Sequence, residues 1–385
     1  MTGKRKKIIR TATVPLSLDL FCRGLFRDMS GEYEIIALSS PLPELDHIRE
    51  REGIRTIAVP MRRKIAPWHD LVSLWRLIRV FRKEKPDMVH SITPKAGLLS
   101  MLAAWLARVP VRVHTFTGLI FPYEKGWKRS LLMFTDRLTA ACATHVIPEG
   151  LGVKNDLLRF RITRKPLHVL GNGNVRGIDL NHYARTEETE HQAQTLREVL
   201  GIPEDDFVFV FVGRLDRDKG IDELVEAFRM LENERDNVHL LLVGEEEPDG
   251  KAILDETRDY LRHSGHIHLS DGWQEDVRPW YAASDALVLP SRREGFPNVV
   301  IEAGAMELAS IVTNINGCRE IITNQKNGII VPAKDAEALY YAMKSFVDHP
   351  DRVRKIASIA REMVGRYEQG FVRQCLNEYY HEVLP

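Results

Sequence analysis

Cysteine is scarce in this sequence and its few copies are scattered. Cys22, Cys142, Cys318 and Cys375 stand singly, without CxxC pairs or the regular spacing of a disulfide framework or a zinc site. This usage argues against a disulfide-rich secreted module and against a structural zinc domain. A reducing compartment fits best, and we expect a cytoplasmic protein.

Long hydrophobic runs are also missing. The longest uncharged apolar stretch, 96–107, is too short to span a bilayer. Residues 1–10 are basic, but they lead into the mixed segment TATVPLSLDLF instead of the clean apolar region of a signal peptide. We therefore expect a soluble chain or one that lies on a membrane surface.

Net charge is absent overall, yet the charges are unevenly distributed. Residues 1–174 carry 30 Lys plus Arg and 15 Asp plus Glu, whereas the remainder carries 24 basic and 39 acidic residues. The chain is therefore a large dipole whose N-terminal half should seek an anionic partner. We expect that partner to be an anionic membrane surface and not a nucleic acid.

What the chain does have is a regular alternation of β-type runs and helix-length amphipathic segments. Predicted strands lie at 7–14, 34–38, 55–59, 87–91, 111–115 and 145–148, and again at 207–213, 239–244, 266–270, 285–290, 310–314 and 328–332. This alternation is typical of parallel α/β sheets, and runs that are apolar at nearly every position indicate strands buried on both faces.

Length and a polar break divide the chain. With 385 residues, 44% of them hydrophobic, the chain is expected to form two domains. A segment rich in Gly and Asn at 171–183 reads as the linker. We predict an N-terminal domain at 1–174, a C-terminal domain at 175–365 and a terminal helix at 366–385, for which the N-terminal domain is one candidate docking partner.

The first motif that suggests chemistry follows the apolar run at 207–213. It reads GRLDRDKG from Gly213 to Gly220 and precedes a helical pattern. Ligands of open α/β sheets bind outside the carboxyl ends of the strands, where Arg214 and Lys219 would project. The fork of an arginine and the mobile charge of a lysine together suit a diphosphate. A solvated turn is the structural alternative.

The second motif follows the apolar run at 285–290 and reads SRREGFPNVVIE. Pro297 suits the first turn of a helix whose N–H groups and positive dipole end would face a ligand, and Gly295 permits close backbone approach. Glu294 would then precede the helix, with Glu302 about one turn inside it. Alternatively, Glu302 is a helix-face carboxylate and Glu294 a capping group.

Together, GRLxxxKG and EGFPxxxxE, with its E-x7-E pair, resemble family 4 of the retaining, nucleotide-sugar-dependent glycosyltransferases of GT-B fold. Segments 272–291 and 327–339 resemble the family's sequence before and after the acidic pair. Segment 86–118 resembles a branch found in bacterial polysaccharide and lipid-linked oligosaccharide assembly. The resemblance implies two facing Rossmann-like domains with a central cleft.

The resemblance also implies residue roles. Arg214 and Lys219 would hold the leaving diphosphate, Glu302 would accept hydrogen bonds from the ribose, and Glu294 would contact the transferred sugar as a catalytic residue. The donor site would further include Gly213, Gly272, Val277, Gly295, Phe296, Pro297, Asn298 and Val299. A helix terminus and two cations can stabilise a departing nucleoside diphosphate without a metal, so we expect neither metal nor cofactor.

In the N-terminal half, the family places a histidine facing the sugar, and His114 occupies that position after the run VRV. We take His114 as the second catalytic candidate. His90 and Lys95 are weaker candidates for the acceptor side. One departure is that many family members carry a Gly-Gly pair in the first loop, where this chain has TVPLSL at 13–18. Contacts from this loop to the donor are therefore in doubt.

The segment 61–85 favours attachment to lipid. It reads as an amphipathic helix with apolar residues on or near one face, namely Trp68, Leu71, Leu74, Trp75, Ile78 and Phe81. A second cluster at 123–129 combines Trp127 with three cations. Cationic residues beside tryptophan suit anionic headgroups, although a core-packed helix with a solvated basic face gives the same pattern.

Other functions stay open. Asp216 and Asp218 form a DxD pair of the kind that metal-dependent GT-A enzymes use, although cations flank both. The glycines of GNGNVRG at 171–177 fit a dinucleotide loop poorly because the third falls one position late. A sugar-nucleotide epimerase of the same fold and a catalytically silent membrane-surface binding protein remain.

The sequence thus predicts a retaining, metal-independent hexosyltransferase. It would move a hexose or N-acetylhexosamine from a nucleotide-sugar, with UDP as the expected nucleotide, to a polyprenyl-diphosphate-linked or other lipid-linked glycan. We expect it to lie peripherally on the inner face of the cytoplasmic membrane, and expect closure of the cleft to bring His114 to the sugar.

Overall fold

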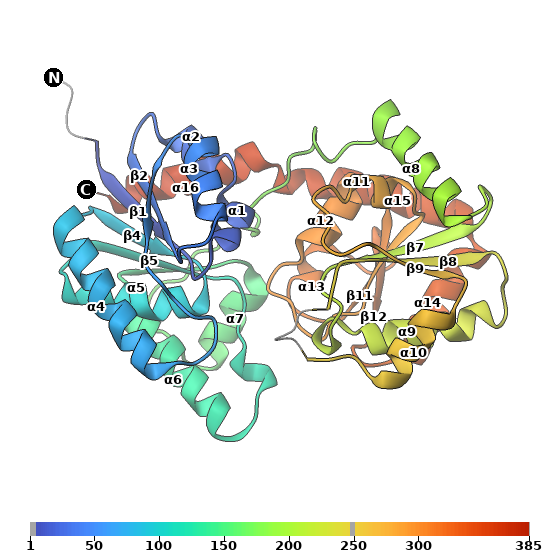
Figure 1. Cartoon of the computed structure of the whole chain (residues 1–385), viewed down its shortest axis with the longest axis horizontal. Coiled ribbons are helices and arrows are strands. Elements are labelled where there is room, and N and C mark those ends of the chain that lie inside the picture. The colour runs from blue at the N-terminus through green and yellow to red at the C-terminus, as the bar shows by residue number, and fades with distance from the viewer. Residues whose placement is uncertain (1–4, 247–250, 385) are drawn as a thin grey trace. The chain divides into compact units, whose positions relative to one another are not determined.

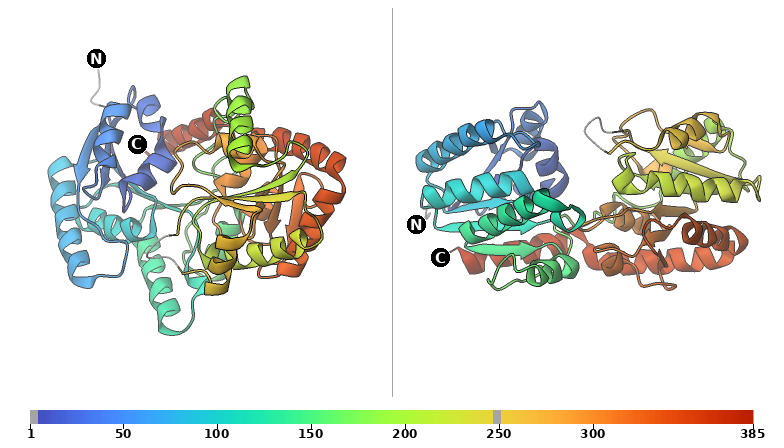
Figure 2. Two further views of the ribbon diagram at one scale, coloured as in Figure 1. Left: turned by 45° about the vertical axis from the view of Figure 1, so that its right-hand side comes forward. Right: turned by 90° about the horizontal axis from the view of Figure 1, so that it is seen from below.

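The computed structural model describes residues 5–246 and 251–384. These form two compact units, one of Met1–Gly177 with Gly370–Pro385 and the other of Ile178–Gln369 (Figure 1). The breaks expected after 174 and 365 lie a few residues before those of the structure. Each unit is an α/β sheet layered between helices, as Figure 2 shows.

The N-terminal unit holds a six-stranded sheet in which every strand pairs in parallel. Its strands are β1 (Lys7–Thr11), β2 (Glu34–Ser39), β3 (Arg55–Ala58), β4 (Met88–Ser91), β5 (Val111–Phe116) and β6 (His145–Pro148), in the order β3-β2-β1-β4-β5-β6. Its helices are α1 (Pro15–Cys22), α2 (Leu25–Met29), α3 (Glu44–Glu52), α4 (Pro67–Glu84), α5 (Pro94–Leu106), η1 (Phe121–Tyr123), α6 (Gly126–Cys142), α7 (Leu151–Arg159) and α16 (Gln369–Val383).

The two faces of this sheet carry separate cores because successive residues of a strand point to opposite sides. Ile9 and Val89 belong to the core beneath α4, α5 and α6. Ile8 and Met88 belong to the other core, which includes residues of α1, α2 and α16. The terminal helix therefore completes the N-terminal unit: Tyr380 accepts a hydrogen bond from Arg10, and its side chain is buried.

The C-terminal unit repeats the architecture, and its strands, apart from the edge strand at Ile267–Leu269, are buried along nearly their whole length. Its strands are β7 (Phe207–Val212), β8 (Val238–Val243), β9 (Ile267–Leu269), β10 (Ala286–Leu289), β11 (Ala309–Thr313) and β12 (Gly328–Val331), in the order β12-β11-β10-β7-β8-β9. Its helices are α8 (Glu187–Leu200), η2 (Arg217–Lys219), α9 (Ile221–Glu232), α10 (Asp255–His263), α11 (Arg278–Ala282), α12 (Asn298–Ala305), α13 (Cys318–Ile321), α14 (Ala336–Asp348), α15 (Pro350–Val364) and η3 (Gly365–Tyr367).

All twelve predicted strands are present. The order of the strands within each sheet was not predicted from the sequence. In each sheet the chain starts in the middle, runs to one edge and then crosses back. The crossing point lies between β1 and β4 in one unit and between β7 and β10 in the other. Loops that leave such a pair on opposite faces open a crevice where ligands of this fold bind.

The helices of the described residues differ in length and apolarity. The longest of them, α4, has 18 residues. Within residues 5–246 and 251–384, none combines the length and apolarity that a membrane span requires.

Candidate functional site

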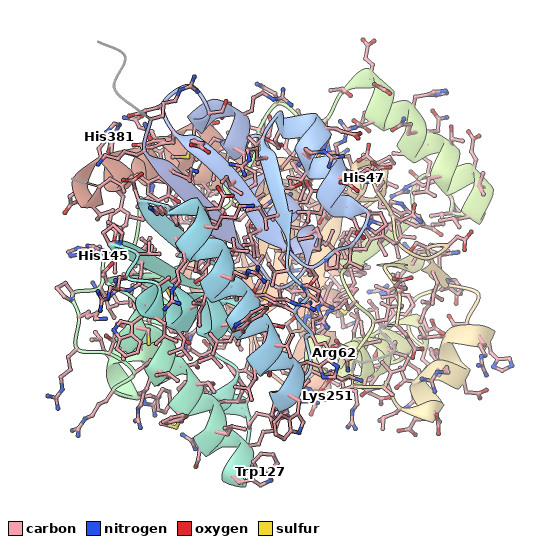
Figure 3. The ribbon with its side chains drawn as sticks, turned by 60° about the vertical axis from the view of Figure 1, so that its left-hand side comes forward. His47, Arg62, Trp127, His145, Lys251 and His381 are labelled. Carbon is pink, nitrogen blue, oxygen red and sulfur yellow. The ribbon has the colours of Figure 1, made fainter. Side chains whose placement is uncertain are left out.

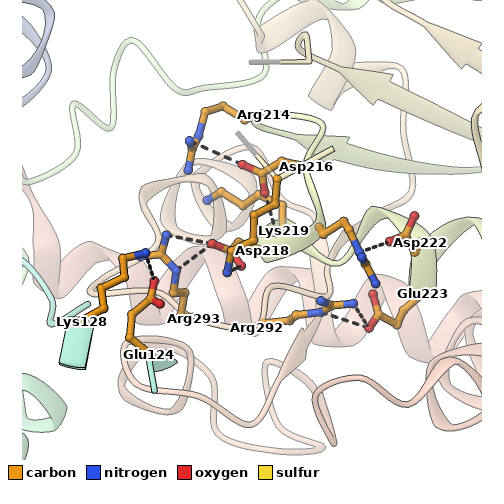
Figure 4. A network of polar contacts seen from close by, with 12 residues as sticks. Glu124, Lys128, Arg214, Asp216, Asp218, Lys219, Asp222, Glu223, Arg292 and Arg293 are labelled. Atoms are coloured by element: carbon orange, nitrogen blue, oxygen red, sulfur yellow. Dashed lines mark hydrogen bonds and ion pairs between the residues drawn. The ribbon is translucent and has the colours of Figure 1, made fainter. Parts of the chain in front are cut away.

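The turn that leaves β7 is held in shape by its own side chains. The Asp216 carboxylate accepts a hydrogen bond from the Lys219 amide at 2.9 Å and so caps η2. The Arg214 guanidinium lies 3.4 Å from the other oxygen of Asp216 (Figure 4). Asp216 is buried while the Arg214 side chain is 45% exposed, so the carboxylate anchors the turn and the arginine reaches outward.

The segment that leaves the neighbouring strand β10 meets this turn directly. The Lys219 ammonium lies 2.6 Å from the Glu294 carboxylate. Gly220 has φ of +76°, and a Cβ built there would stand 2.2 Å from the carbonyl oxygen of Pro290. A lysine, a carboxylate and a close backbone approach therefore join the two motifs, which are about 75 residues apart in sequence but follow adjacent strands.

Further ion pairs brace the same loops. Arg292 donates two hydrogen bonds to one oxygen of Glu223, and Arg293 donates two to one oxygen of Asp218 (Figure 4). Lys251 binds the other oxygen of Asp218 at 2.8 Å, and these cations hold the pKa of Asp218 below its usual value against the opposing effect of burial. Asp218 is thus a structural acceptor here.

This arrangement bears on the metal-binding alternative. Asp216 already binds a backbone amide and lies beside Arg214, and Asp218 already binds two cations. Along the described ranges, no group of three or more His, Cys, Asp or Glu side chains is placed to hold a metal ion. The DxD carboxylates therefore serve the turn itself.

Glu302 lies inside α12 and is 5% exposed. Its carboxylate accepts a hydrogen bond from the Tyr281 hydroxyl at 3.1 Å. Tyr281 is fully buried on α11, and the sequence analysis did not single it out because nothing in its local pattern marks it. The acidic pair thus splits into a partly accessible Glu294 and a buried, oriented Glu302.

The start of α12 differs slightly from the prediction. Pro297 lies just before the helix, with an extended ψ of 104°, and Asn298 is the first helical residue. Phe296 is buried with its ring against Tyr367, 5.4 Å between centroids. The Phe296 side chain therefore packs into the protein, whereas Glu294 and Asn298 of the same segment stay partly exposed. Gly317, also missed from the sequence, has φ of +74° and packs so closely that a Cβ would stand 2.4 Å from the Gly295 carbonyl oxygen.

The segment after β9 carries Gly272 and Val277, two of the residues predicted for the donor site. Gly272 has φ of +63°, and its carbonyl accepts a hydrogen bond from the Ser270 hydroxyl at 2.9 Å. The same hydroxyl accepts from the Gly244 amide at 3.0 Å, which ties this loop to the end of β8. Val277 is the residue before α11. Gly213, Gly244 and Gly272 thus belong to neighbouring strand ends.

His114 lies near the end of β5 in a tightly fitted position. Its Nδ1 is joined to the Ser91 hydroxyl by a 2.8 Å hydrogen bond, and its ring meets the edge of Phe116 at 4.5 Å between centroids. A Cβ added to Gly97 of α5 would stand 2.3 Å from Cε1 of His114. The side chain is 2% exposed, and burial lowers its pKa to about 3. This histidine is therefore neutral near pH 7.

His90 and Lys95, the two acceptor-side candidates, differ in position: His90 lies on the other face of the sheet and Lys95 in the first turn of α5. His90 points to the opposite face of the sheet, where it binds Arg10 and Tyr380 through Nδ1 and Thr115 through Nε2. Burial and the charge of Arg10 hold its pKa well below the usual range. Lys95 forms a 2.5 Å ion pair with Asp70. Of the two histidines, only His114 lies on the face covered by α5, beside the Ser91 hydroxyl.

The unusual first loop closes on its neighbour. The Thr13 amide donates to the Thr93 hydroxyl at 2.9 Å, and the Thr13 hydroxyl accepts from the Ala96 amide at 3.2 Å. Thr13 therefore satisfies a free N–H at the start of α5, at the crossing point between β1 and β4. This side-chain cap occupies the place where a Gly-Gly loop would leave backbone exposed.

The His114 environment predicts an acid-dependent loss of stability. The pKa is about 3 in the folded chain and about 6.5 when unfolded, so between these values only the unfolded chain binds the proton. The free energy of unfolding should fall as the pH drops from about 6.5, by up to about 1.4 kcal/mol per pH unit.

Urea unfolding at pH 7 and pH 5 would measure this effect. His114→Asn should show a smaller difference between the two midpoints than the unchanged chain does. His263→Asn, at an exposed ring, is the matched control. An equal acid dependence in the His114 variant and the parent chain would contradict the assignment.

Comparison with known proteins identifies the family of this chain. Residues 192–363 match the family model of the glycosyl transferases group 1, and residues 23–173 match that of the glycosyl transferase 4-like domain. The chain is 30% identical over 390 residues to the capsular polysaccharide biosynthesis glycosyltransferase CapM of Staphylococcus aureus, covering 99% of this chain and 98% of that protein. The chain belongs to the group 1 glycosyltransferases.

A second relative supports the same assignment, and a solved structure shows the fold. A UDP-Gal:alpha-D-GlcNAc-diphosphoundecaprenol alpha-1,3-galactosyltransferase of Escherichia coli is 30% identical over 315 residues, 80% of this chain and 78% of that one. The crystal structure of Anabaena Alr3699/HepE in complex with UDP-glucose aligns with a TM-score of 0.80 at 18% identity, over 98% of this chain and 99% of that chain. The second match shows that the fold is GT-B.

Proposed function

We propose that this glycosyltransferase moves a hexose or N-acetylhexosamine from a UDP-sugar to a lipid-linked glycan, with retention of configuration and without a metal, in the synthesis of a cell-surface polysaccharide. The observation that carries the proposal is the meeting of Lys219 and Glu294 at the crossing point between β7 and β10. That is the position at which open α/β sheets bind ligands.

The chemistry of the donor follows from the residues gathered there. Departure of a nucleoside diphosphate leaves negative charge on the phosphate oxygens, which cations and helix N-termini stabilise. Arg214 reaches outward from a turn fixed by Asp216, and Lys219 lies beside it in the same turn. Positive charge is therefore preorganised on the C-terminal unit for a diphosphate.

The ion pair between Lys219 and Glu294 should change when the donor binds. With no donor bound, each neutralises the other across 2.6 Å. An incoming diphosphate would compete with Glu294 for the lysine, which would release the carboxylate next to the transferred sugar. We assign Glu294 to the sugar, Glu302 to the ribose in the orientation set by Tyr281, and the second sugar contact to His114.

The acceptor class rests on the relatives and on charge. One relative is named for capsular polysaccharide synthesis, and another for transfer to a diphosphoundecaprenol-linked sugar. The N-terminal half of this chain carries twice as many basic as acidic residues, as an anionic diphosphate-linked lipid at a membrane surface would require. We therefore place the enzyme peripherally on the cytoplasmic membrane.

A screen of nucleotide-sugar donors tests this proposal. Incubation with UDP-sugars and GDP-sugars should show hydrolysis or transfer with one or more UDP-sugars, unchanged by excess EDTA. The released or transferred sugar should keep the anomeric configuration of the donor, as read by proton NMR. Inverted product, or turnover that EDTA abolishes and Mg²⁺ restores, would refute the retaining or metal-independent part.

The same screen distinguishes the epimerase alternative. An epimerase would convert a UDP-sugar into its stereoisomer with the nucleotide still attached and with no acceptor present. Chromatography of the nucleotide products separates the two outcomes. A silent binding protein would show no conversion of any donor.

A further inference from the structure

The helix α4 has two apolar sides, which corrects the single face expected from its pattern. Leu77 and Phe81, in its C-terminal half, are buried in the core. Trp68, Leu71 and Trp75, in its N-terminal half, are exposed, with Trp68 at 81%. The core therefore covers only one side of α4. The other side leaves Trp68, Leu71 and Trp75 exposed, and an exposed apolar surface of this kind usually marks an interaction site.

The helix α6 repeats this arrangement. Its C-terminal residues Thr139, Ala140 and Cys142 are buried. Its second residue, Trp127, is 75% exposed, and Phe134, about two turns further on, is exposed as well. Figure 3 shows Trp127 at the tip of the N-terminal unit. Both helices thus present tryptophan at their first turn.

Topology brings these first turns to one edge of the unit. The helices α4, α5 and α6 each precede the next parallel strand, so their N-termini all lie at the carboxyl edge of the sheet. Both α4 and α6 pack against α5. Trp68 and Trp127 are therefore on the same edge as His114 near the end of β5, whereas Trp105, at the end of α5, lies at the opposite edge.

The charges around this edge are positive. Arg62, in the loop before α4, and Lys125, just before α6, are exposed. The nearby acids are already paired, Asp70 with Lys95 at 2.5 Å and Glu124 with Lys128 at 2.8 Å. Arg62 and Lys125 therefore add positive charge to this edge. Exposed tryptophan next to cations is the composition that binds the interface of an anionic bilayer.

We propose that this aromatic rim, made of residues 62–75 and 123–134, seats the N-terminal unit on an anionic phospholipid surface. The inference rests on the proposed function for its purpose, which is to bring a lipid-linked acceptor to the carboxyl edge that holds His114. The tryptophans enter the headgroup region and the cations contact the lipid phosphates. A second copy of the chain is the other occupant that such a surface could take.

Vesicle sedimentation tests the rim with the full chain. The protein should bind vesicles of phosphatidylcholine mixed with phosphatidylglycerol and bind phosphatidylcholine alone at least about tenfold more weakly. Trp68→Ser with Trp127→Ser should lower binding to the anionic vesicles by at least about tenfold. Trp105→Ser is the matched control, since Trp105 is 53% exposed at the opposite edge, and it should leave binding unchanged.

The outcomes separate the possibilities. Equal loss in Trp105→Ser and in the rim variant, or no loss in either, overturns the proposal. So does a dimer on size exclusion that the rim substitutions dissociate. Donor hydrolysis without vesicles should be the same in the rim variant and the parent chain, so a parent that binds vesicles but turns over no donor would refute the proposed function and leave the rim standing.

Discussion

Replacing Arg214 by alanine should lower kcat/KM for the nucleotide-sugar by about 100- to 1000-fold. Arg214 reaches outward from the turn after β7. Asp216 holds this turn in shape, because its carboxylate binds both the Lys219 amide and the Arg214 guanidinium. Loss of the guanidinium would remove a preorganised positive charge from the departing diphosphate. The measurement is the initial rate of donor hydrolysis or transfer over a range of donor concentrations.

Two further variants sharpen that experiment. Arg235→Ala removes an arginine at the far end of α9 that pairs with Asp348, and turnover should stay unchanged. Glu294→Gln should lower kcat strongly without raising the donor KM, because the amide no longer competes with the diphosphate for Lys219. If Arg214→Ala and Glu294→Gln both kept full turnover, the site would have to lie elsewhere.

Gly220→Ala should weaken both stability and donor binding. The backbone at Gly220 has φ of +76°, which costs any other L-residue about 1–2 kcal/mol. Its added Cβ would also meet the Pro290 carbonyl oxygen at 2.2 Å, and overpacking of this kind costs about 1–3 kcal/mol more. Relief of the clash would push apart the segments that carry Lys219 and Glu294, so donor KM should rise as the urea midpoint falls.

The chain contains a matched control for this substitution. Gly201, after α8, has φ of +69°, but a Cβ there would meet nothing within 4 Å. Gly201→Ala therefore measures the cost of the backbone conformation alone. The excess loss in Gly220→Ala reports the close approach of the two donor segments, and an equal loss in both variants would show that this approach contributes nothing.

The strands were predictable because each is a local feature. FVFVFV at 207–212 is buried along its whole length between two layers of helices, so its composition alone identifies it. The motifs at 213–220 and 291–302 were also recognisable from the sequence, since each places its cations or carboxylates just after a strand. What local sequence does not contain is that β7 and β10 are neighbours, and only this pairing brings Lys219 to Glu294.

The histidines show where local reasoning stops. His90 and His114 both stand near strand ends, and the sequence treats them alike as candidates for the site. The register places His114 opposite Ser91, and because side chains alternate along a strand, His90 turns to the other face toward Tyr380. Tyr380 comes from the last helix, whose docking partner the pattern did not identify.

The basic, aromatic helix α4 marks the same limit. Its composition indicates an amphipathic surface, but only packing shows that Leu77 and Phe81 satisfy the core while Trp68 and Trp75 remain outside. The sequence by itself determined the class of fold and the strands, and it identified the residues that we propose for diphosphate binding, since these depend on local composition. The tertiary structure decided which residues meet and which stay exposed, because strand order and side-chain direction are set by contacts between distant segments.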